Sequence, residues 1–433
     1  MKQLIIIGAG WAGLSAAVAA TQVGWQVRLF EATTHAGGRA RSLTKHFAGQ
    51  PLDNGQHVLI GAYRDTLALM RTVGLNPDTL LRRVPLDLRF ADGQGLCLRD
   101  WPSPVNLLEG VARAQGWSLK DKASLIQASW RWQRAKFSCD PTWTVAQLCD
   151  EAGLSPRVLR QLIEPLCLSA LNTPVDEASA TVFLRVLRDA LMGERGSSDL
   201  LIPVVDLGAL LPEACVHWLR ERGADIRLGE RITPNAFEEL ARTTGATQPL
   251  LLACPPWEAA RLSVKLAPDW ANACAQLPHA AIATVYLRCN DHGFSGLPQP
   301  MLALHAGTQA PAQFVFDRGT LNAQTGLLAA VVSACTGEND EITEQVRKQV
   351  AAQLSLTNLE TVQTVIEKRA TLSCWPMLER PDTFVASSVW ACGDYIHGPY
   401  PSTLEGAVRS GQQAITQLSP HRVAEASGYR LNF

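Results

Sequence analysis

The stretch Leu4-Ile5-Ile6-Ile7-Gly8-Ala9-Gly10-Trp11-Ala12-Gly13 decides the expected fold of this 433-residue chain. Its first four residues are an apolar run of the kind that a buried parallel strand needs. The three glycines have G-x-G-x-x-G spacing, which permits a tight turn, close approach of backbone to a pyrophosphate, and close packing of helix on strand. A predicted helix over residues 14–23 would aim its N-terminal N–H groups at the phosphates. We therefore expect a dinucleotide to be held by Gly8, Gly10, Trp11, Ala12 and Gly13.

The next segment adds the acidic residue that such a site requires. Val27-Arg28-Leu29-Phe30-Glu31 reads as a second apolar strand, and Glu31 ends it 18 residues after Gly13. An acidic side chain at that place can accept hydrogen bonds from both ribose hydroxyls. Strand, glycines, helix, second strand and acid occur in order, which favours a dinucleotide site over a glycine-rich turn in a packed core.

Gly37-Gly38-Arg39-Ala40-Arg41 follows directly. With the fingerprint before it, this segment resembles the flavin amine oxidase and phytoene desaturase superfamily. In that superfamily a similar G-G-R segment follows the ribose acid and sets an arginine against the pyrophosphate. The resemblance implies that Gly38 and Arg39 bind the cofactor, and that the cofactor is FAD rather than a nicotinamide.

Residues 389–407 hold a second pattern typical of a cofactor site. Val389-Trp390-Ala391-Cys392-Gly393-Asp394 reads as a strand ending in a turn, and a helix is expected over residues 403–418. Ser402 and Glu405 have the S-x-x-E spacing of a capping box. Such a helix end suits the flavin N1/C2=O edge, where negative charge accumulates on reduction. Asp394 can accept a hydrogen bond from a ribityl or phosphate-side hydroxyl. An ordinary strand–loop–helix connection has the same pattern, and the N-terminal fingerprint favours the flavin.

Composition narrows the class of protein. The chain is 47% hydrophobic, 18% charged and has a net charge of −1, so no whole-molecule attraction to nucleic acid is expected. Eleven cysteines without a C-x-x-C pair favour reduced core thiols and a cytoplasmic protein. The nine histidines form no H-E-x-x-H motif, so no metal site is expected.

Residues 2–20 imitate a signal peptide, but the glycine spacing assigns them to strand, turn and helix. No transmembrane helix is expected.

The order of elements predicts an α/β fold with two interleaved domains. Residues 101–200 read mainly as helices, and residues 280–368 as short strands with one helix around 341–354. We expect a Rossmann-like FAD-binding domain of the two-dinucleotide-binding-domain type and an α+β substrate-binding domain. The first comprises residues 1–95, 200–265 and 370–433, and the second comprises residues 96–199 and 266–369.

Four further stretches resemble a narrower group, the squalene-associated flavoproteins of bacterial hopanoid pathways. They are residues 53–61, 164–174, 198–203 and 367–371. The resemblance implies reductive dehydroxylation of hydroxysqualene, an apolar C30 isoprenoid alcohol, to squalene. An external electron donor must then reduce FAD, because no nicotinamide site is evident.

The resemblance also implies roles for individual residues. Gln56 and His57 pass near the flavin face, and Ile232 offers backbone contacts to adenine. Four more residues lie on the ribityl and isoalloxazine sides, namely Gly393, Asp394, Thr403 and Leu404. One departure is visible, because relatives often have Trp-Thr where this chain has Tyr395-Ile396.

Loss of water from an allylic alcohol requires a proton donor. His57 is the candidate catalytic residue, because histidine holds a proton near neutral pH and this position is expected beside the flavin. A structural histidine that bonds backbone explains the position equally well. Tyr395 and His397 are the fallback donors.

Residues 101–137 suggest contact with a lipid surface. They contain four of the twelve tryptophans, and six basic residues stand against two acidic ones. Tryptophan with Lys and Arg on helices suits a lipid headgroup interface, which predicts peripheral attachment to the inner face of the cytoplasmic membrane. A solvated basic face on a helix that covers the substrate domain explains the same pattern.

Three other functions stay open. A carotenoid or phytoene desaturase runs the opposite redox direction on a similar hydrocarbon. An amine oxidase needs an aromatic cage at the flavin, which Trp375, Tyr395 and Tyr400 could build. A lipid-carrying escort protein would not use the flavin, and the intact glycines with Glu31 and Arg39 argue against it.

Overall fold

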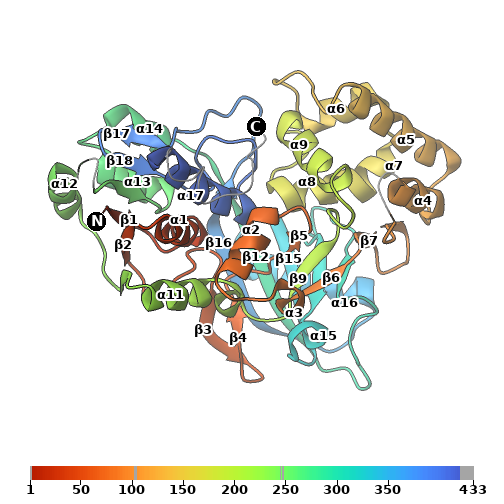
Figure 1. The fold of residues 1–433 in the computed structure, drawn as a ribbon. Coiled ribbons are helices and arrows are strands. Elements are labelled where there is room, and N and C mark those ends of the chain that lie inside the picture. Colours follow the sequence, from red (N-terminus) through yellow and green to blue (C-terminus); the bar gives the residue numbers. More distant parts are fainter. Residues whose placement is uncertain (1, 102–104, 244, 246–247, 420–433) are drawn as a thin grey trace.

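The computed structural model describes residues 2–101, 105–243, 245 and 248–419. A six-stranded sheet in the order β10-β2-β1-β11-β18-β17 forms one half of the molecule (Figure 1). Its first five strands are parallel and β17 is antiparallel. The bounds are β1 Gln3–Ile7, β2 Gln26–Glu31, β10 Asp225–Leu228, β11 Leu250–Leu252, β17 Phe384–Ala386 and β18 Val389–Ala391.

Helices cover both faces of this sheet, which explains why β1 is apolar at nearly every position. Leu4 and Ile6 face α1 (Trp11–Gln22), α11 (Pro212–Glu221) and α17 (Leu404–Leu418). Ile5 and Ile7 belong to the opposite core with α12 (Pro234–Thr243), α13 (Pro256–Ser263) and α14 (Pro268–Ala275). The predicted Rossmann-like architecture is confirmed.

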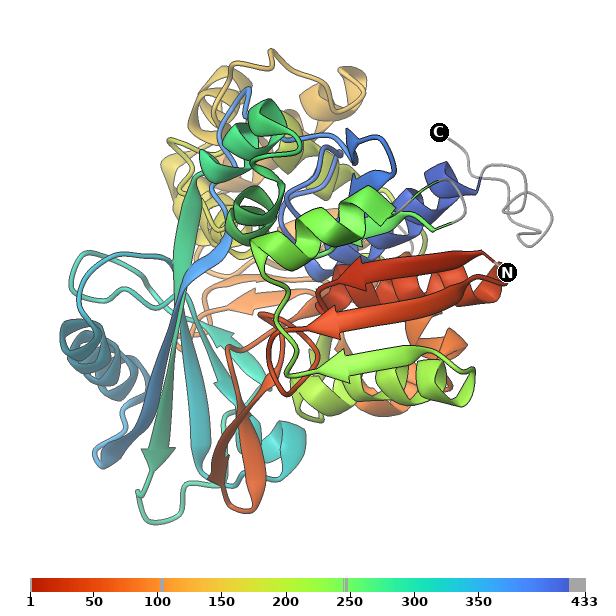
Figure 2. The same cartoon turned by 90° about the vertical axis from the view of Figure 1, so that its left-hand side faces the viewer.

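A second, antiparallel sheet has the order β13-β14-β15-β12-β16. In Figure 2 its long strands stand beside the parallel strands β1, β2 and β10, whose carboxyl ends point toward it. One face packs on α16 (Asn339–Leu354) and the other joins the core of the helical region. The bounds are β12 His279–Cys289, β13 Met301–Ala303, β14 Phe314–Asp317, β15 Leu327–Cys335 and β16 Leu359–Leu372.

The helical region packs against one face of this antiparallel sheet (Figure 1). It comprises α4 Val105–Arg113, α5 Leu119–Arg134, α6 Val145–Ala152, α7 Pro156–Val158, η1 Leu159–Ile163, α8 Glu164–Leu171 and α9 Ala180–Leu191. The helical stretch over residues 156–171 is divided by the π-helical turn η1. Pro165 lies in the first turn of α8 and has no N–H to continue the preceding ladder, which accounts for the change of pitch.

Short elements connect the larger ones. They are the hairpin β3 (Ser42–Phe47) and β4 (Gln50–Asp53), the sheet β5 (Leu59–Ile60), β9 (Leu200–Pro203) and β6 (Leu81–Val84), the pair β7 (Asp87–Arg89) and β8 (Gly95–Cys97), and the helices α2 (Arg64–Thr72), α3 (Pro77–Leu80), α10 (Leu207–Leu210) and α15 (Arg318–Asn322). The helical stretch over residues 207–221 is interrupted between α10 and α11, because Leu211 leaves helical geometry before Pro212. No described helix is long and apolar enough to cross a membrane.

Candidate cofactor and substrate site

A cavity of about 530 Å³ lies at the carboxyl ends of the parallel strands. Distant parts of the chain line it, around residues 7–12, 30–41, 54–58, 230–232, 253–258, 367–371 and 393–407. Three of the four stretches that carried the narrower resemblance contribute to its wall, and residues 198–203 do not. A crevice at this edge is where open α/β sheets bind ligands.

The glycine turn after β1 forms one end of the cavity from backbone. Gly8 has φ of +115°, and a Cβ there would lie 2.6 Å from the Ala253 carbonyl oxygen. Gly10 faces open space, since its nearest neighbour would be the Gly38 Cα at 4.0 Å. Helix α1 begins after Gly10 with no side-chain cap and no acidic residue in its first turn. These features fit a diphosphate group.

Gly13 does not line the cavity. A Cβ at this position would overlap the carbonyl oxygen of Gly8, so Gly13 allows α1 to pack against the turn. That geometry accords with the packing role expected of the third glycine.

Glu31 lies at the end of β2 on the cavity wall. Its Oε2 accepts a hydrogen bond from the Ala9 N–H at 2.8 Å, and its Oε1 accepts from the Thr33 N–H at 2.8 Å. Ile232 lines the same region. The carboxylate is thus held in place by backbone donors on both sides.

Arg39 and Asp394 meet across the cavity from segments 355 residues apart. Arg39 Nη2 lies 2.6 Å from Asp394 Oδ1, and Arg39 Nη1 donates to the Ala370 carbonyl at 2.7 Å. The guanidinium therefore joins the G-G-R turn, the end of β16 and the turn after β18. Gly38 and Gly393 line the cavity beside them.

The capping-box prediction for α17 was wrong. Thr403 is the N-cap residue, and its Oγ1 accepts from the Gly406 N–H at 3.1 Å. Ser402 instead donates to the Asp394 carbonyl at 3.3 Å. Glu405 turns to α2 and accepts from Thr66 N–H at 2.9 Å, because its carboxylate satisfies the start of that helix. Thr403 and Leu404 both line the cavity.

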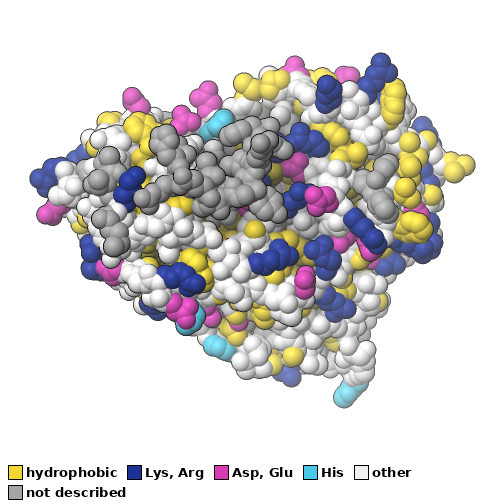
Figure 3. Space-filling model, in the orientation of Figure 1, with side chains coloured by type: hydrophobic (Ala, Val, Ile, Leu, Met, Phe, Trp, Pro, Cys, Tyr) yellow, Lys and Arg dark blue, Asp and Glu magenta, His cyan; other side chains and the backbone are white. Residues whose placement is uncertain are grey.

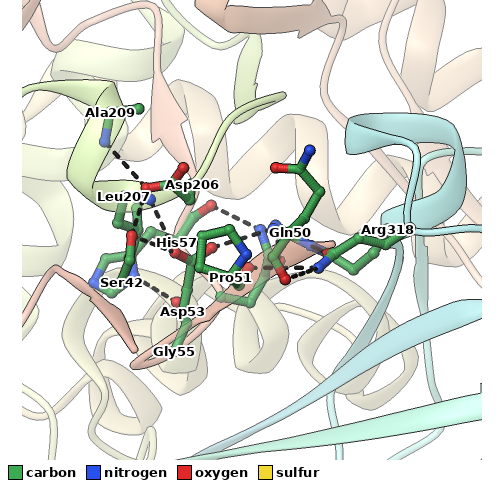
Figure 4. Close-up of polar contacts among 12 residues, drawn as sticks. Ser42, Gln50, Pro51, Asp53, Gly55, His57, Asp206, Leu207, Ala209 and Arg318 are labelled. Carbon is green, nitrogen blue, oxygen red and sulfur yellow. Dashed lines mark hydrogen bonds and ion pairs between the residues drawn. The ribbon is translucent and has the colours of Figure 1, made fainter. Parts of the chain in front are cut away.

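A buried ion pair supports the segment that carries Gln56 and His57 (Figure 4). The guanidinium of Arg318, at the start of α15, lies 3.2 Å from Asp53 Oδ2 at the end of β4. The two side chains are 1% and 3% exposed. Burial raises the pKa of Asp53 to about 6, and the attraction of Arg318 opposes this change.

The same guanidinium reaches the cavity wall. Arg318 Nη1 donates to Gln56 Oε1 at 3.1 Å, and Gln56 Nε2 donates to the His57 carbonyl at 3.1 Å. The Gln56 N–H also donates to Thr284 Oγ1 on β12, at 3.2 Å. The segment after β4 is therefore held by one side chain from β12 and one from the start of α15.

Among the candidate proton donors, His57 alone presents a ring to the cavity with a defined hydrogen bond. Its Nδ1 lies 2.9 Å from the Gly55 carbonyl oxygen, so Nδ1 carries a proton and donates it there. Burial lowers the pKa of His57, and the Arg39 charge acts in the same direction.

The two fallback donors are less suited. Tyr395 is 1% exposed, its hydroxyl has no partner in the described structure, and burial raises its pKa well above the ordinary value. His397 is exposed and does not line the cavity.

Sequence reasoning missed Arg318, Asn54 and Glu367. Asn54 Nδ2 donates to the Arg39 carbonyl at 3.0 Å and to Glu367 Oε2 at 3.2 Å, which ties three wall segments together. A signal for Arg318 existed, since Asp317-Arg318 directly follows the apolar strand residues Phe314–Phe316. Charged residues that follow a buried apolar strand need hydrogen-bond or ion-pair partners inside the protein.

Topology and cavity together place the chain among flavin-dependent oxidoreductases. It belongs to the family described as flavin containing amine oxidoreductase, whose model matches residues 11–418.

Relatives of similar length carry one common name. The chain is 25% identical to hydroxysqualene dehydroxylase of Zymomonas mobilis, over 96% of this chain and 99% of that protein. It is 27% identical to hydroxysqualene dehydroxylase of Rhodopseudomonas palustris, over 95% and 97% of the two chains. Among solved structures, an oxidoreductase from Methanosarcina mazei is similar with a TM-score of 0.69 and 17% identity, over 96% of this chain and all of that one (100%). Reduced UDP-galactopyranose mutase has a TM-score of 0.67 at 13% identity, over 99% and 97%. These two structures support the fold.

Proposed function

We propose that this enzyme binds FAD and converts hydroxysqualene to squalene by reductive dehydroxylation. The observation that carries the proposal is the shared wall of the cavity. Residues 54–58, 367–371 and Ser169, which lie in the stretches resembling squalene-associated flavoproteins, surround the same space as the dinucleotide fingerprint. The full-length similarity to two hydroxysqualene dehydroxylases supports the same substrate.

FAD, rather than a mononucleotide, suits a cavity that is lined by the glycine turn, by Glu31 and by the Arg39–Asp394 pair. The glycine turn and uncapped start of α1 would hold the diphosphate, and Glu31 would accept from the adenosine ribose. Arg39 would lie against the pyrophosphate, and Asp394, which Arg39 contacts, would lie toward the ribityl side. We retain the proposed division into a cofactor domain (1–95, 200–265, 370–433) and a substrate domain (96–199, 266–369). The strands of the six-stranded sheet lie in the first set of ranges, and those of the antiparallel sheet lie in the second apart from residues 370–372 of β16.

In the proposed reaction the allylic C–O bond breaks, a C–H bond forms, and the hydroxyl leaves as water after gaining one proton. Reduced FAD, when bound, would supply the hydride and would itself become oxidised. His57 would bind the substrate hydroxyl through Nε2, because its Nδ1–H is committed to the Gly55 carbonyl. Its imidazolium form would supply the proton.

A test of substrate class uses purified protein, reduced FAD and anaerobic conditions. We expect squalene from hydroxysqualene. Polyene formation from phytoene would indicate a desaturase instead, and peroxide release with simple amines in air would indicate an amine oxidase.

We also propose that the α4–α5 face docks on anionic lipid. Two of the four tryptophans in residues 101–137 are core residues, Trp117 and Trp132, whereas Trp101 and Trp130 are about half exposed. Leu108, Leu119 and Ile126 are exposed on the same helices. In Figure 3 hydrophobic and basic side chains gather at the end of the molecule that these helices form. Residues 102–104 of this segment lie outside the described residues.

Neutralising Lys120, Lys122, Arg131 and Arg134 together should reduce sedimentation with vesicles containing anionic lipid by about tenfold or more, since each basic residue near such a surface contributes about 1 kcal/mol. A matched variant neutralises Arg220, Arg222, Arg227 and Arg231, which lie in other parts of the chain. Equal sedimentation of both variants and the unmodified protein would exclude this surface.

A further inference from the structure

A second, apolar pocket lies inside the helical region. It is lined by fifteen residues from the β7–β8 pair and from α4, α5, η1, α8 and α9, of which only Ser129 and Gln133 are polar. Its volume is about 40 Å³. Protein interiors are close-packed and contain few voids larger than a water molecule, so a pocket walled by so many leucines is unusual.

The pocket has one lining residue with a small side chain, and this residue lies on α5. Ser129 lies between Leu125 and Trp132 on the pocket side of the helix, where the neighbouring positions carry large apolar side chains. Gln133 and Met192 also line the pocket, and their Nε2 and Sδ atoms lie 3.8 Å apart. Met192 is 40% exposed, so this part of the pocket lies near the protein surface.

Helix α8 contributes one residue to the lining of this pocket and another to the lining of the cofactor cavity. Leu166 lines the pocket, and Ser169 lines the cavity. Residues three apart lie on the same face of a helix, about 4.5 Å apart along its axis. The two spaces are therefore neighbours along one helix face.

We propose that this pocket binds the terminal isoprene unit of one arm of the substrate, which rests on the proposed function. The cofactor cavity is walled by Glu31, Arg39 and Asp394, whereas the pocket offers almost only hydrocarbon surface. A volume of this size corresponds to about three waters, which is the scale of one branched C5 end. The enzyme then binds the reacting carbon at the flavin and the chain end in the helical region. The pocket therefore selects substrates by chain length.

The test fills the pocket without disturbing the cavity. In Ser129→Leu the added side chain occupies the space of the isoprene end, while Gln127→Leu adds the same side chain on the exposed face of α5. We expect Ser129→Leu to raise the KM for hydroxysqualene about tenfold, because burial of several carbons is lost. With an analogue that lacks the terminal isoprene unit on both arms, Ser129→Leu and the unmodified enzyme should have equal KM. Gln127→Leu should resemble the unmodified enzyme with both substrates.

A binding measurement decides the question independently of catalysis. Squalene should raise the melting temperature of the unmodified FAD-loaded protein and of Gln127→Leu, and should raise that of Ser129→Leu distinctly less. An equal squalene effect on all three proteins, or an equal KM change for both substrates, would overturn the pocket assignment. If no protein dehydroxylates hydroxysqualene, the proposed function fails, and the squalene-dependent shifts still test the pocket.

Discussion

The two ends of the cofactor cavity are built from different parts of the polypeptide. At the end near β1 and β2 the wall is mainly backbone, made by Gly8, Gly10 and the start of α1 within one short stretch. At the other end the wall is made by side chains from distant segments, joined by the Arg39–Asp394 and Arg318–Asp53 ion pairs. Local sequence therefore specifies the first end, and tertiary structure alone assembles the second.

This contrast predicts different consequences of substitution. A substitution at the backbone end should abolish the cofactor cavity. A substitution at the side-chain end should leave the cavity in place and weaken the contacts that hold its wall.

The largest effect is expected at Gly13. Any side chain there overlaps the Gly8 carbonyl, and the overlap is with backbone that cannot rotate away. We expect Gly13→Val to abolish FAD binding and to prevent recovery of folded protein, measured by bound flavin absorbance and circular dichroism. Gly307→Val is the matched control, because no atom lies within 4 Å of a Cβ at that position. Normal flavin content in Gly13→Val would contradict the assigned packing.

A smaller effect is expected at Arg318. Arg318→Met leaves the Asp53 carboxylate buried without its partner, which should lower the free energy of unfolding by about 3–5 kcal/mol. Arg83→Met removes the partner of Asp199 from a pair whose arginine is 45% exposed, and should cost about 1 kcal/mol or less. Urea unfolding of the two variants measures the difference. Equal losses of unfolding free energy in the two variants would show that burial of the Arg318–Asp53 pair does not increase its contribution to stability.

The smallest effect concerns protonation rather than structure. If His57 acts as the proton donor, only its imidazolium form is active, and burial lowers its pKa below the ordinary 6.5. The rate constant kcat/KM should then fall about tenfold per pH unit above that pKa. We expect His57→Gln to be slow and nearly independent of pH, and His397→Gln to match the unmodified enzyme. A falling profile retained in His57→Gln would assign the proton to another group.

Sequence reasoning succeeded where one local pattern determines the structure. The strand–glycine–helix order of residues 4–23 predicted β1 and α1, because turn geometry and helix packing act within a few residues. It failed where partners are distant. Thr403 rather than Ser402 caps α17, since Ser402 bonds the Asp394 carbonyl and Glu405 is drawn to α2. The Asp53–Arg318 pair spans 265 residues, and no local spacing predicts it.

The central claim is that reduced FAD in this cavity reduces an allylic alcohol. The most direct measurement is an anaerobic single turnover, in which the enzyme-bound FAD is reduced, excess reductant is removed, and hydroxysqualene is added. We expect flavin oxidation and squalene formation to proceed together, with about one squalene formed per flavin. Flavin that stays reduced in the presence of hydroxysqualene, with no squalene formed, would contradict it.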